Sequence, residues 1–227
     1  MRRIVIASNN RHKIVELEQM LAASPEPAVR AFQVASAGAL GYGPAPEVPE
    51  TSDQFVGNAL LKVHGIAEWL RQHGEPSDTV VIADDSGLCV DAFDGAPGVY
   101  SARFAGIPTD DDANNAKLVA ELRARGLDGS PAHYVCLLAV RYAGEQPLEP
   151  TPVLDAVAVH EGCLCIEGRC HGNVRTQRRG DGGFGYDPYF WVDGDTRTFA
   201  ELSPSGKAER SHRGAAMRLF VEQLALL

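Results

Sequence analysis

The alternation of β-branched and amphipathic segments in the first third of the chain constrains the fold most. Residues 2–7 (RRIVIA) have the composition of a short strand, and residues 9–23 repeat apolar side chains at helical spacing. Residues 28–36 predict a second strand, residues 51–74 a long helix, and residues 79–83 (TVVIA) a third strand. Strands that alternate with helices in this way indicate an α/β fold.

The long helix gives the clearest signal. Apolar residues from Phe55 to Leu70 form one continuous stripe. Thr51 and Gln54 have capping-box spacing, which predicts that the helix begins near Thr51. A Gly- and Pro-rich loop, residues 38–50, precedes it.

Strands cluster in the second half of the chain. Residues 110–126 predict a helix that begins with a run of acids, as a helix N-terminus favours. Residues 133–142 and 154–174 are mostly β, and residues 211–227 form a closing amphipathic helix. With no repeat and no long linker, we expect one α/β domain over 1–227, built on a mixed sheet.

Composition and charge argue against several classes of partner. The 227 residues include 44% hydrophobic and 22% charged side chains, as in ordinary globular proteins. A net charge of -9 argues against a nucleic acid polymer, whose binding needs Lys and Arg. No apolar run approaches the roughly 20 residues of a membrane span. Only four apolar residues follow the N-terminal arginines, too few for a signal peptide. We expect no membrane association and a cytoplasmic location.

Five cysteines, an odd number, indicate thiols in a reducing compartment. Cys163, Cys165, Cys170 and His171 could hold zinc, but structural zinc sites carry C-x2-4-C knuckles that this cluster lacks. Cys163 and Cys165 alternate as in a strand, so we favour a strand over a zinc site.

Two adjacent acids, Asp84 and Asp85, follow the apolar strand 79–83 where we expect it to end. Open α/β sheets bind ligands beyond the C-terminal ends of their strands. Together with Glu50, these carboxylates suit Mg²⁺, which takes oxygen ligands and retains waters. A bound cation would offset the repulsion between the two aspartates. The alternative is a solvated turn beside a helix cap.

Residues 8–13 (SNNRHK) lead into the first helix and place Lys13 in its first turn. Free backbone N–H groups and the helix dipole favour an anion there. Ser8, Asn9, Asn10 and Lys13 could therefore hold phosphates, although the Walker pattern is absent. The alternative is an ordinary helix cap.

Residues 180–191 (GDGGFGYDPYFW) surround Phe184 with glycines. Glycine allows backbone to approach a ligand closely, and an aromatic ring offers a stacking face to a base. Asp187 could accept hydrogen bonds from ring N–H groups. The alternative is a β-bulge with Phe184 in the core.

Three basic residues, Lys207, His212 and Arg213, lie around the start of the closing helix. They could clamp an anion or the edge of a base. Alternatively, Ser211 simply caps the helix and the basic side chains are exposed. A metal site, a phosphate grip, an aromatic platform and a polar clamp together fit a nucleoside triphosphate.

Five motifs in order resemble the inosine triphosphate pyrophosphatases of the RdgB type over nearly the whole chain. They are ASNNRHKIVEL, ETSDQFVGNALLKV, ADDSGLCVDAFDGAPGVYSARFAG, GGFGYDPYFW and AELSPSGKAERSHRG. The resemblance implies an elongated mixed sheet flanked by helices, two lobes enclosing a cleft, and a homodimer. It also implies magnesium-dependent hydrolysis of ITP, dITP and XTP to the monophosphate and pyrophosphate.

The resemblance also implies roles for individual residues. Asp85 would be catalytic, and Glu50 and Asp85 would bind the metal, with Asp84 as a possible third ligand. The remaining positions would bind substrate: Ser8, Asn9, Asn10, Arg11, His12, Lys13, Ser86, Phe184, Gly185, Tyr186, Asp187, Lys207, His212 and Arg213. The family often has Glu where this chain has Gly57, before Asn58.

Two alternative functions remain open from the sequence. One is a pyrophosphatase of the Maf type, which acts on other modified nucleotides. The other is a nucleotide-binding protein without catalysis, although that function would not require Glu50, Asp84 and Asp85 together.

Overall fold

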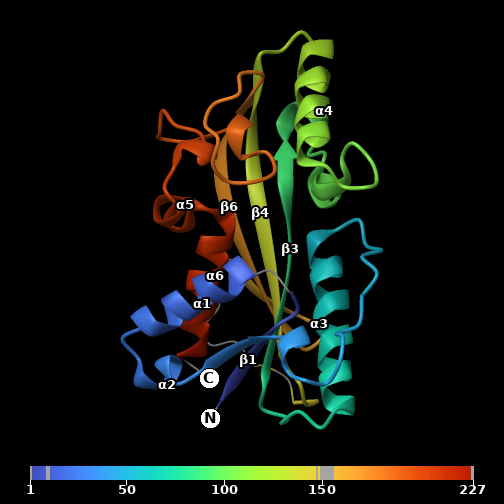
Figure 1. The fold of residues 1–227 in the computed structure, drawn as a ribbon, viewed down its shortest axis with the longest axis vertical. Coiled ribbons are helices and arrows are strands. Elements are labelled where there is room, and N and C mark those ends of the chain that lie inside the picture. The colour runs from blue at the N-terminus through green and yellow to red at the C-terminus, as the bar shows by residue number, and fades with distance from the viewer. Residues whose placement is uncertain (1, 9–10, 147, 149–155, 226–227) are drawn as a thin grey trace. The chain divides into compact units, whose positions relative to one another are not determined.

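The computed structural model describes residues 2–8, 11–146, 148 and 156–225. The chain forms an α/β fold around a seven-stranded mixed sheet (Figure 1). The strands are β1 (Arg3–Ile6), β2 (Gln33–Ser36), β3 (Val80–Val90), β4 (Gly129–Tyr142), β5 (Val157–His160), β6 (Cys163–Arg175) and β7 (Phe190–Val192). The α-helices are α1 (Arg11–Ala23), α2 (Pro27–Arg30), α3 (Phe55–Gln72), α4 (Asp111–Ala124), α5 (Pro204–Arg210) and α6 (His212–Leu224).

The sheet has the strand order β2-β1-β3-β4-β6-β5, and β7 also pairs with β6. Strand β1 is parallel to both β2 and β3, and its Ile6 lies opposite Ile82. Strands β5 and β7 are both antiparallel to β6. The sheet is therefore mixed, as the sequence predicts: helices connect the parallel strands near the N-terminus, and a tight turn joins β5 to β6.

The chain divides into two compact units. The first unit contains residues 1–85, 137–168 and 216–227, and the second contains 86–136 and 169–215. Strands β3, β4 and β6 contribute residues to both units. The expectation of a single domain over 1–227 stays a prediction.

The core of the first unit lies on both faces of its strands. On one face, the apolar stripe of α3 packs against Val5, Val81 and Ala139. Strand residues alternate between faces, so Ile4 and Ile6 point to the opposite side, where Figure 1 shows α1 and α6. The two faces are therefore covered by helices that come from different parts of the chain.

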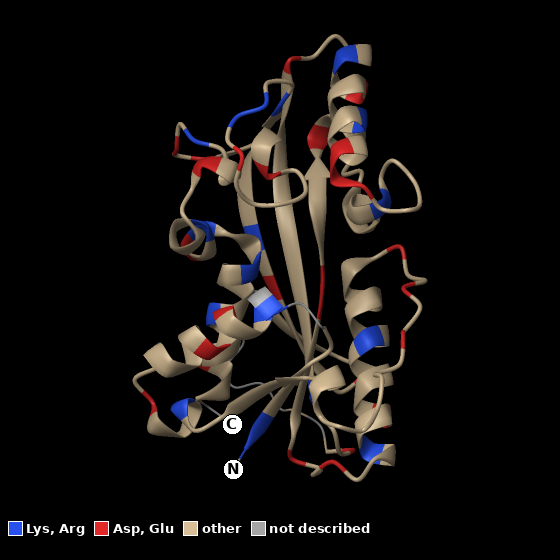
Figure 2. Ribbon diagram, in the orientation of Figure 1, with Lys and Arg blue, Asp and Glu red and all other residues tan. Residues whose placement is uncertain are grey.

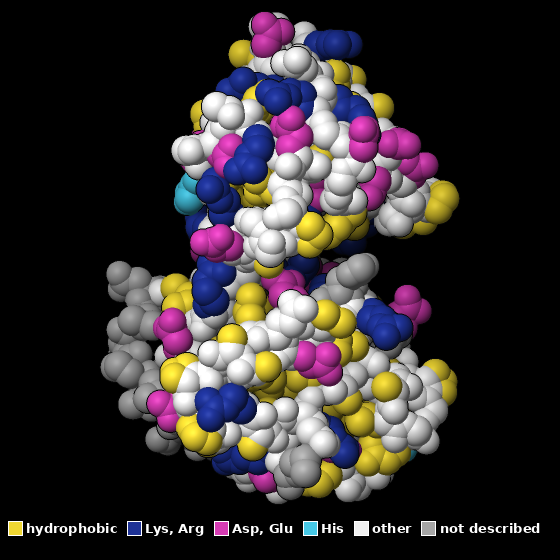
Figure 3. Space-filling view, turned by 60° about the vertical axis from the view of Figure 1, so that its left-hand side comes forward, with side chains coloured by type: hydrophobic (Ala, Val, Ile, Leu, Met, Phe, Trp, Pro, Cys, Tyr) yellow, Lys and Arg dark blue, Asp and Glu magenta, His cyan; other side chains and the backbone are white. Residues whose placement is uncertain are grey.

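The core of the second unit is rich in aromatic rings. The ring centroids of Tyr134 and Phe190 are 4.8 Å apart, and those of Phe190 and Phe199 are 5.0 Å apart. Leu118 and Leu122 of α4 pack against the same cluster. On the face shown in Figure 3, basic and acidic side chains are interspersed.

Two predicted elements differ from the structure. The strand predicted over 28–36 is wrong in its first half, where α2 begins with Pro27 in its first turn, a position that proline favours. The helix predicted from Thr51 begins instead at Phe55, and Gln54 forms no side-chain cap. The N–H of Ser52 bonds Asn58, which holds this segment as a loop.

The helix ends elsewhere follow local chemistry. Asp110 caps α4 by accepting the N–H of Ala113, which confirms the acidic start predicted there. The short helix α5 was not predicted; Ser203 caps it, and Pro204 occupies its first turn. Within the described residues, no helix combines the length and the hydrophobicity needed to cross a bilayer.

Replacing Leu138 by Ala tests the sheet core. Leu138 is fully buried in β4, so its truncation removes apolar contacts and leaves a cavity. We expect the free energy of unfolding to fall by roughly 2–5 kcal/mol, measured by urea denaturation. Val159 of β5 is 45% exposed and serves as the control. V159A should change stability by about 0.5 kcal/mol or less, and equal losses in both variants would contradict this core assignment.

Candidate functional site

Asp84 and Asp85 lie within β3, not after it, because β3 extends to Val90. Figure 2 shows acidic positions, in red, along this strand. The prediction that the strand ends before these acids is therefore wrong. What ends there is the parallel neighbour: Ile6 is the last residue of β1 and pairs with Ile82. Strand β3 continues beside β4. The acids thus lie just beyond the end of one neighbouring strand, and both are buried.

Asp84 is paired with a lysine from α1. The Nζ atom of Lys13 lies 2.5 Å from Oδ1 of Asp84, and both side chains are mostly buried. The predicted phosphate-binding lysine and one of the predicted acids are thus in direct contact.

Asp85 is paired with residues of α3. Asn58 donates from Nδ2 to Asp85 Oδ2 at 3.1 Å, and Lys62 Nζ lies 3.6 Å from Asp85 Oδ1. The same Lys62 nitrogen lies 3.3 Å from Glu50 Oε2. Neighbouring residues of a strand point to opposite faces, so Asp84 and Asp85 meet different helices. Lys13 and Lys62 supply the charge compensation that we expected from a bound cation.

Asn58 also fixes the segment that carries Glu50. Its Oδ1 accepts the N–H of Ser52 at 2.9 Å while its amide donates to Asp85. Gly57 permits this approach, because a Cβ there would lie 2.1 Å from Ser52 Oγ. The departure from the family pattern at Gly57 therefore has a steric reason in this chain.

The surroundings of Asp85 shift the pKa of its carboxyl in opposite directions. Burial raises the pKa of its carboxyl above the usual range, while Lys62 and the hydrogen bond from Asn58 lower that pKa. Glu50 and Asp84 raise it further. The balance leaves the pKa of Asp85 raised, so its carboxylate is a stronger base than an exposed aspartate.

Within the described part of the chain, no group of three or more His, Cys, Asp and Glu side chains is arranged to hold a metal ion. Glu50 and Asp85 nevertheless flank one ammonium nitrogen, as the distances above show. Mg²⁺ commonly binds one or two carboxylates together with waters and phosphates. The oxygen ligands of Glu50 and Asp85 fit this requirement.

The structure describes only part of the predicted phosphate-binding segment. Asn9 and Asn10 lie outside the described residues, as does the side chain of His12. Ser8 is half-buried after β1, and Arg11 is exposed at the start of α1.

In the second unit, Phe184, Asp187 and Lys207 form one group. Asp187 Oδ2 accepts the N–H of Phe184 at 2.8 Å and forms an ion pair with Lys207. The Lys207 ammonium lies 4.2 Å from the centroid of the Phe184 ring, which is 64% exposed. The alternative that Phe184 belongs to the core is therefore wrong. Gly183, at φ 76°, is needed here, because a Cβ would lie 2.0 Å from Asp187 Oδ2.

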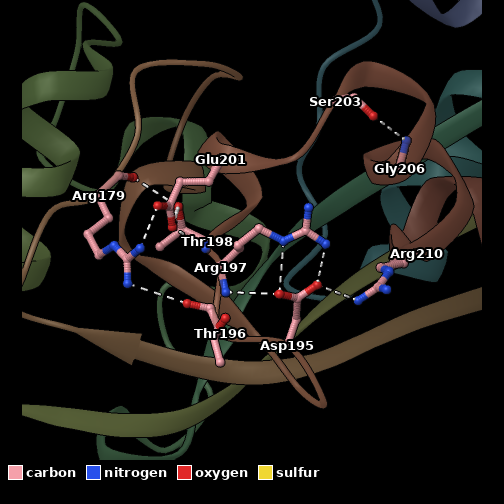
Figure 4. A network of polar contacts seen from close by, with 9 residues as sticks. All are labelled: Arg179, Asp195, Thr196, Arg197, Thr198, Glu201, Ser203, Gly206 and Arg210. Carbon is pink, nitrogen blue, oxygen red and sulfur yellow. Dashed lines mark hydrogen bonds and ion pairs between the residues drawn. The ribbon is translucent and has the colours of Figure 1, made fainter.

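A polar network supports the helix that carries Lys207 (Figure 4). Asp195 accepts hydrogen bonds from Arg197 and from Arg210 at the end of α5. Arg179 binds Glu201, whose carboxylate accepts the N–H of Thr198. The Arg210 bond ties α5 to the segment after β7, and the Arg179 bond ties the segment before β7 to the residues that precede α5.

His212, Arg213 and Ser86 also belong to the second unit. His212 is buried and stacks on Tyr134, with centroids 4.7 Å apart and an interplanar angle of 8°. Arg213 donates to Ser86 Oγ at 3.2 Å. Ser211 caps α6 by accepting the N–H of Gly214, so the cap and the basic residues coexist. Tyr186 is buried and donates to the carbonyl of Ser101.

Sequence reasoning missed Asn58 and Lys62 as members of the site. Both lie on α3 four residues apart, so they share one side of the helix. The available signal in the sequence was an asparagine within the apolar stripe, which the structure shows to be buried. The partner of Lys62 lies on β3, and only folding brings the two together.

Replacing Lys62 by Met should raise the pKa of Asp85 further, since the cation that lowers it is lost while burial and Glu50 remain. When folding raises the pKa of an acid, the folded protein loses stability as the pH rises from the pKa of that acid in the unfolded state to its pKa in the folded state. In K62M, this fall in stability should continue to a higher pH. NMR titration of the Asp85 carboxyl carbon measures the shift.

The exposed Arg71, which pairs with Glu68 on the same helix, provides the control R71M. An unchanged Asp85 pKa in K62M, or an equal rise in R71M, would show that Lys62 is not the partner that sets it.

Comparison with known proteins adds an independent observation. The sequence profile of the Ham1 family matches residues 4–223. A protein from Ralstonia nicotianae named dITP/XTP pyrophosphatase is 43% identical over 230 residues, covering 100% of this chain and 98% of that protein. A Bacillus cereus protein of the same name is 37% identical and covers 99% and 95%, respectively.

Solved structures show the same relationship. A HAM1 protein from Coxiella burnetii has a TM-score of 0.80 at 30% identity and covers 100% of both chains. The Ham1 protein of Staphylococcus aureus has a TM-score of 0.76 at 33% identity and covers 97% of both. The resemblance recognised from the five motifs is confirmed, and the chain belongs to the Ham1 family.

Proposed function

We propose that this chain hydrolyses deaminated purine nucleoside triphosphates, namely ITP, dITP and XTP, to the monophosphate and pyrophosphate. Relatives that match nearly the whole chain carry the name dITP/XTP pyrophosphatase, which favours this activity over a Maf-type one. The observation that carries the proposal is the buried carboxylate of Asp85 held beside Lys62, Asn58 and Glu50.

Glu50 and Asp85 would hold Mg²⁺, with Asp84 as a possible further ligand. The Lys62 nitrogen, within 3.6 Å of both carboxylates, marks a position where positive charge is already favourable. When bound, the metal would neutralise charge on phosphate oxygens.

Asp85 would act as the general base. Its raised pKa makes the carboxylate a better proton acceptor, which general base catalysis near neutral pH requires. It would take a proton from the water that attacks the α-phosphorus, while the bond from that phosphorus to the bridging oxygen breaks and pyrophosphate leaves. Asn58 would orient the carboxylate, and Lys62 would hold it ionised.

The start of α1 would bind the phosphates, through Ser8, Asn9, Asn10, Arg11, His12 and Lys13. Lys13 pairs with Asp84 in the structure. An incoming phosphate would supply a second anion for the same ammonium group, in a helix turn whose N–H groups favour anions.

The second unit would supply the contacts to nucleoside. The exposed ring of Phe184 offers a stacking face, with Gly185, Tyr186 and Asp187 completing its loop. Ser86 and Lys207 would add polar contacts. His212 and Arg213 would donate to the 6-oxo group of hypoxanthine or xanthine, and the adenine amino group would leave such donors unpaired.

A non-catalytic nucleotide-binding protein is the weaker candidate. Such a protein needs the aromatic platform but has no use for a buried carboxylate between a lysine and an asparagine. A homodimer and a cytoplasmic location stay predictions.

The direct test is incubation of the protein with ITP and MgCl₂, followed by separate assays for pyrophosphate and orthophosphate. We expect one pyrophosphate per IMP, with much slower turnover of ATP and of dUTP, and loss of activity with EDTA. Orthophosphate as the first product, or faster turnover of dUTP than ITP, would refute the proposal.

Replacing Asp85 by Asn should abolish pyrophosphate release, because the amide cannot accept the proton. The same change removes a buried ionised group whose pKa folding raises, so the melting temperature at pH 7 should be maintained or increased. Asp91, an exposed acid directly after the end of β3, gives the control D91N, which should keep activity. Undiminished turnover in D85N would exclude Asp85 as the base.

A further inference from the structure

Both backbone polar groups of Gly185 are held by side chains of α4. The Gly185 N–H donates to Asp111 Oδ2 at 2.7 Å, and the Gly185 carbonyl accepts from Asn115 Nδ2 at 2.9 Å. Asp111 and Asn115 lie four residues apart, so they share one side of α4. The two contacts span about 70 residues of sequence and lie within the second unit.

Gly185 directly follows Phe184, and its φ of 59° is in the left-handed region. On its other side, Phe184 is held through its own N–H by Asp187. Tyr186 is anchored through its hydroxyl to the carbonyl of Ser101 at 2.8 Å. The backbone around Phe184 is thus bonded at consecutive positions, while the ring itself is 64% exposed.

The chemistry at both α4 positions matches the backbone group that each contacts. Asn115 is buried, and its amide must donate to the Gly185 carbonyl, which an aspartate at this position could not do. Asp111 is exposed and accepts from an N–H, a charge-assisted hydrogen bond. Removal of either contact would leave the N–H or the carbonyl of Gly185 without its partner on α4.

We propose that Asp111 and Asn115 are positioning residues for the purine base. They act through Gly185, fixing the loop so that the Phe184 ring is presented in a binding-ready position before the ligand arrives. Preorganisation of this kind improves affinity because less ordering is needed on binding. The inference rests on the proposed function, in which Phe184 stacks on the base. It adds two residues that do not themselves contact the nucleotide.

Calorimetric titration with IMP tests this inference independently of turnover. Asp111→Ala should weaken IMP binding on the order of tenfold, the effect of losing one charge-assisted hydrogen bond. Asp112→Ala is the matched control, since it removes the same charge from the same exposed helix turn. D112A should bind IMP as the unmodified protein does. Equal affinities in D111A and D112A would overturn the proposal.

Asn115→Asp provides a second variant that keeps the shape of the side chain, replaces the donor to Gly185 with an acceptor and adds a negative charge. It should weaken IMP binding at least as much as D111A, with a circular dichroism spectrum like that of the unmodified protein. If N115D does not fold, D111A and D112A still decide the result. Undiminished IMP affinity in folded N115D would contradict the role of Asn115.

Titration with pyrophosphate distinguishes a specific effect on the loop that bears Phe184 from a general loss of structure in the variants. Its dissociation constant should be the same in all variants, because the proposed phosphate ligands lie in the first unit. A parallel loss of pyrophosphate binding would overturn the positioning role. If the unmodified protein binds IMP but releases no pyrophosphate from ITP, the proposed function fails while this inference is still tested by the IMP affinities.

Discussion

The first unit depends on the two adjacent buried acids of β3. A buried carboxylate is tolerated only with a partner of opposite charge or with hydrogen bonds, because removal from water is costly. Strand geometry sends Asp84 and Asp85 to opposite faces, and each meets a lysine from a different helix, Lys13 of α1 and Lys62 of α3. The charges therefore link β3 to the helices on both of its faces.

In the second unit, the charge of a buried acid is compensated in a different way. Its buried acid, Asp187, is neutralised by Lys207 and also accepts a backbone N–H of the loop that bears Phe184. Burial raises the pKa of Asp187, and these contacts lower it. Here the buried charge shapes a loop instead of joining helices, and it leaves an aromatic ring exposed beside a cation. An exposed ring held by a bonded backbone is suited to stacking.

Local sequence patterns predicted the elements well where a single mechanism dominates. The stripe of α3, the Asp110 cap of α4 and the β-rich second half all appear in the structure. Predictions were wrong where a distant contact decided the outcome. The capping box at Thr51 does not form, because the Gln54 N–H that it would use donates to Ser52 Oγ, and Ser52 is itself bonded to Asn58. Strand β3 passes through its acids because β4 lies beside it.

The sequence by itself determined the family, through five ordered motifs, and the alternation that produces a mixed sheet. It also identified Asp84, Asp85 and Lys13 as chemically important residues. Only the tertiary structure decided which cation meets which acid, and that Lys62, Asn58, Asp111 and Asn115 contact these motifs. Residue type and spacing report periodicity along one element, whereas an ion pair between a helix and a strand depends on how the two pack, which no local pattern encodes.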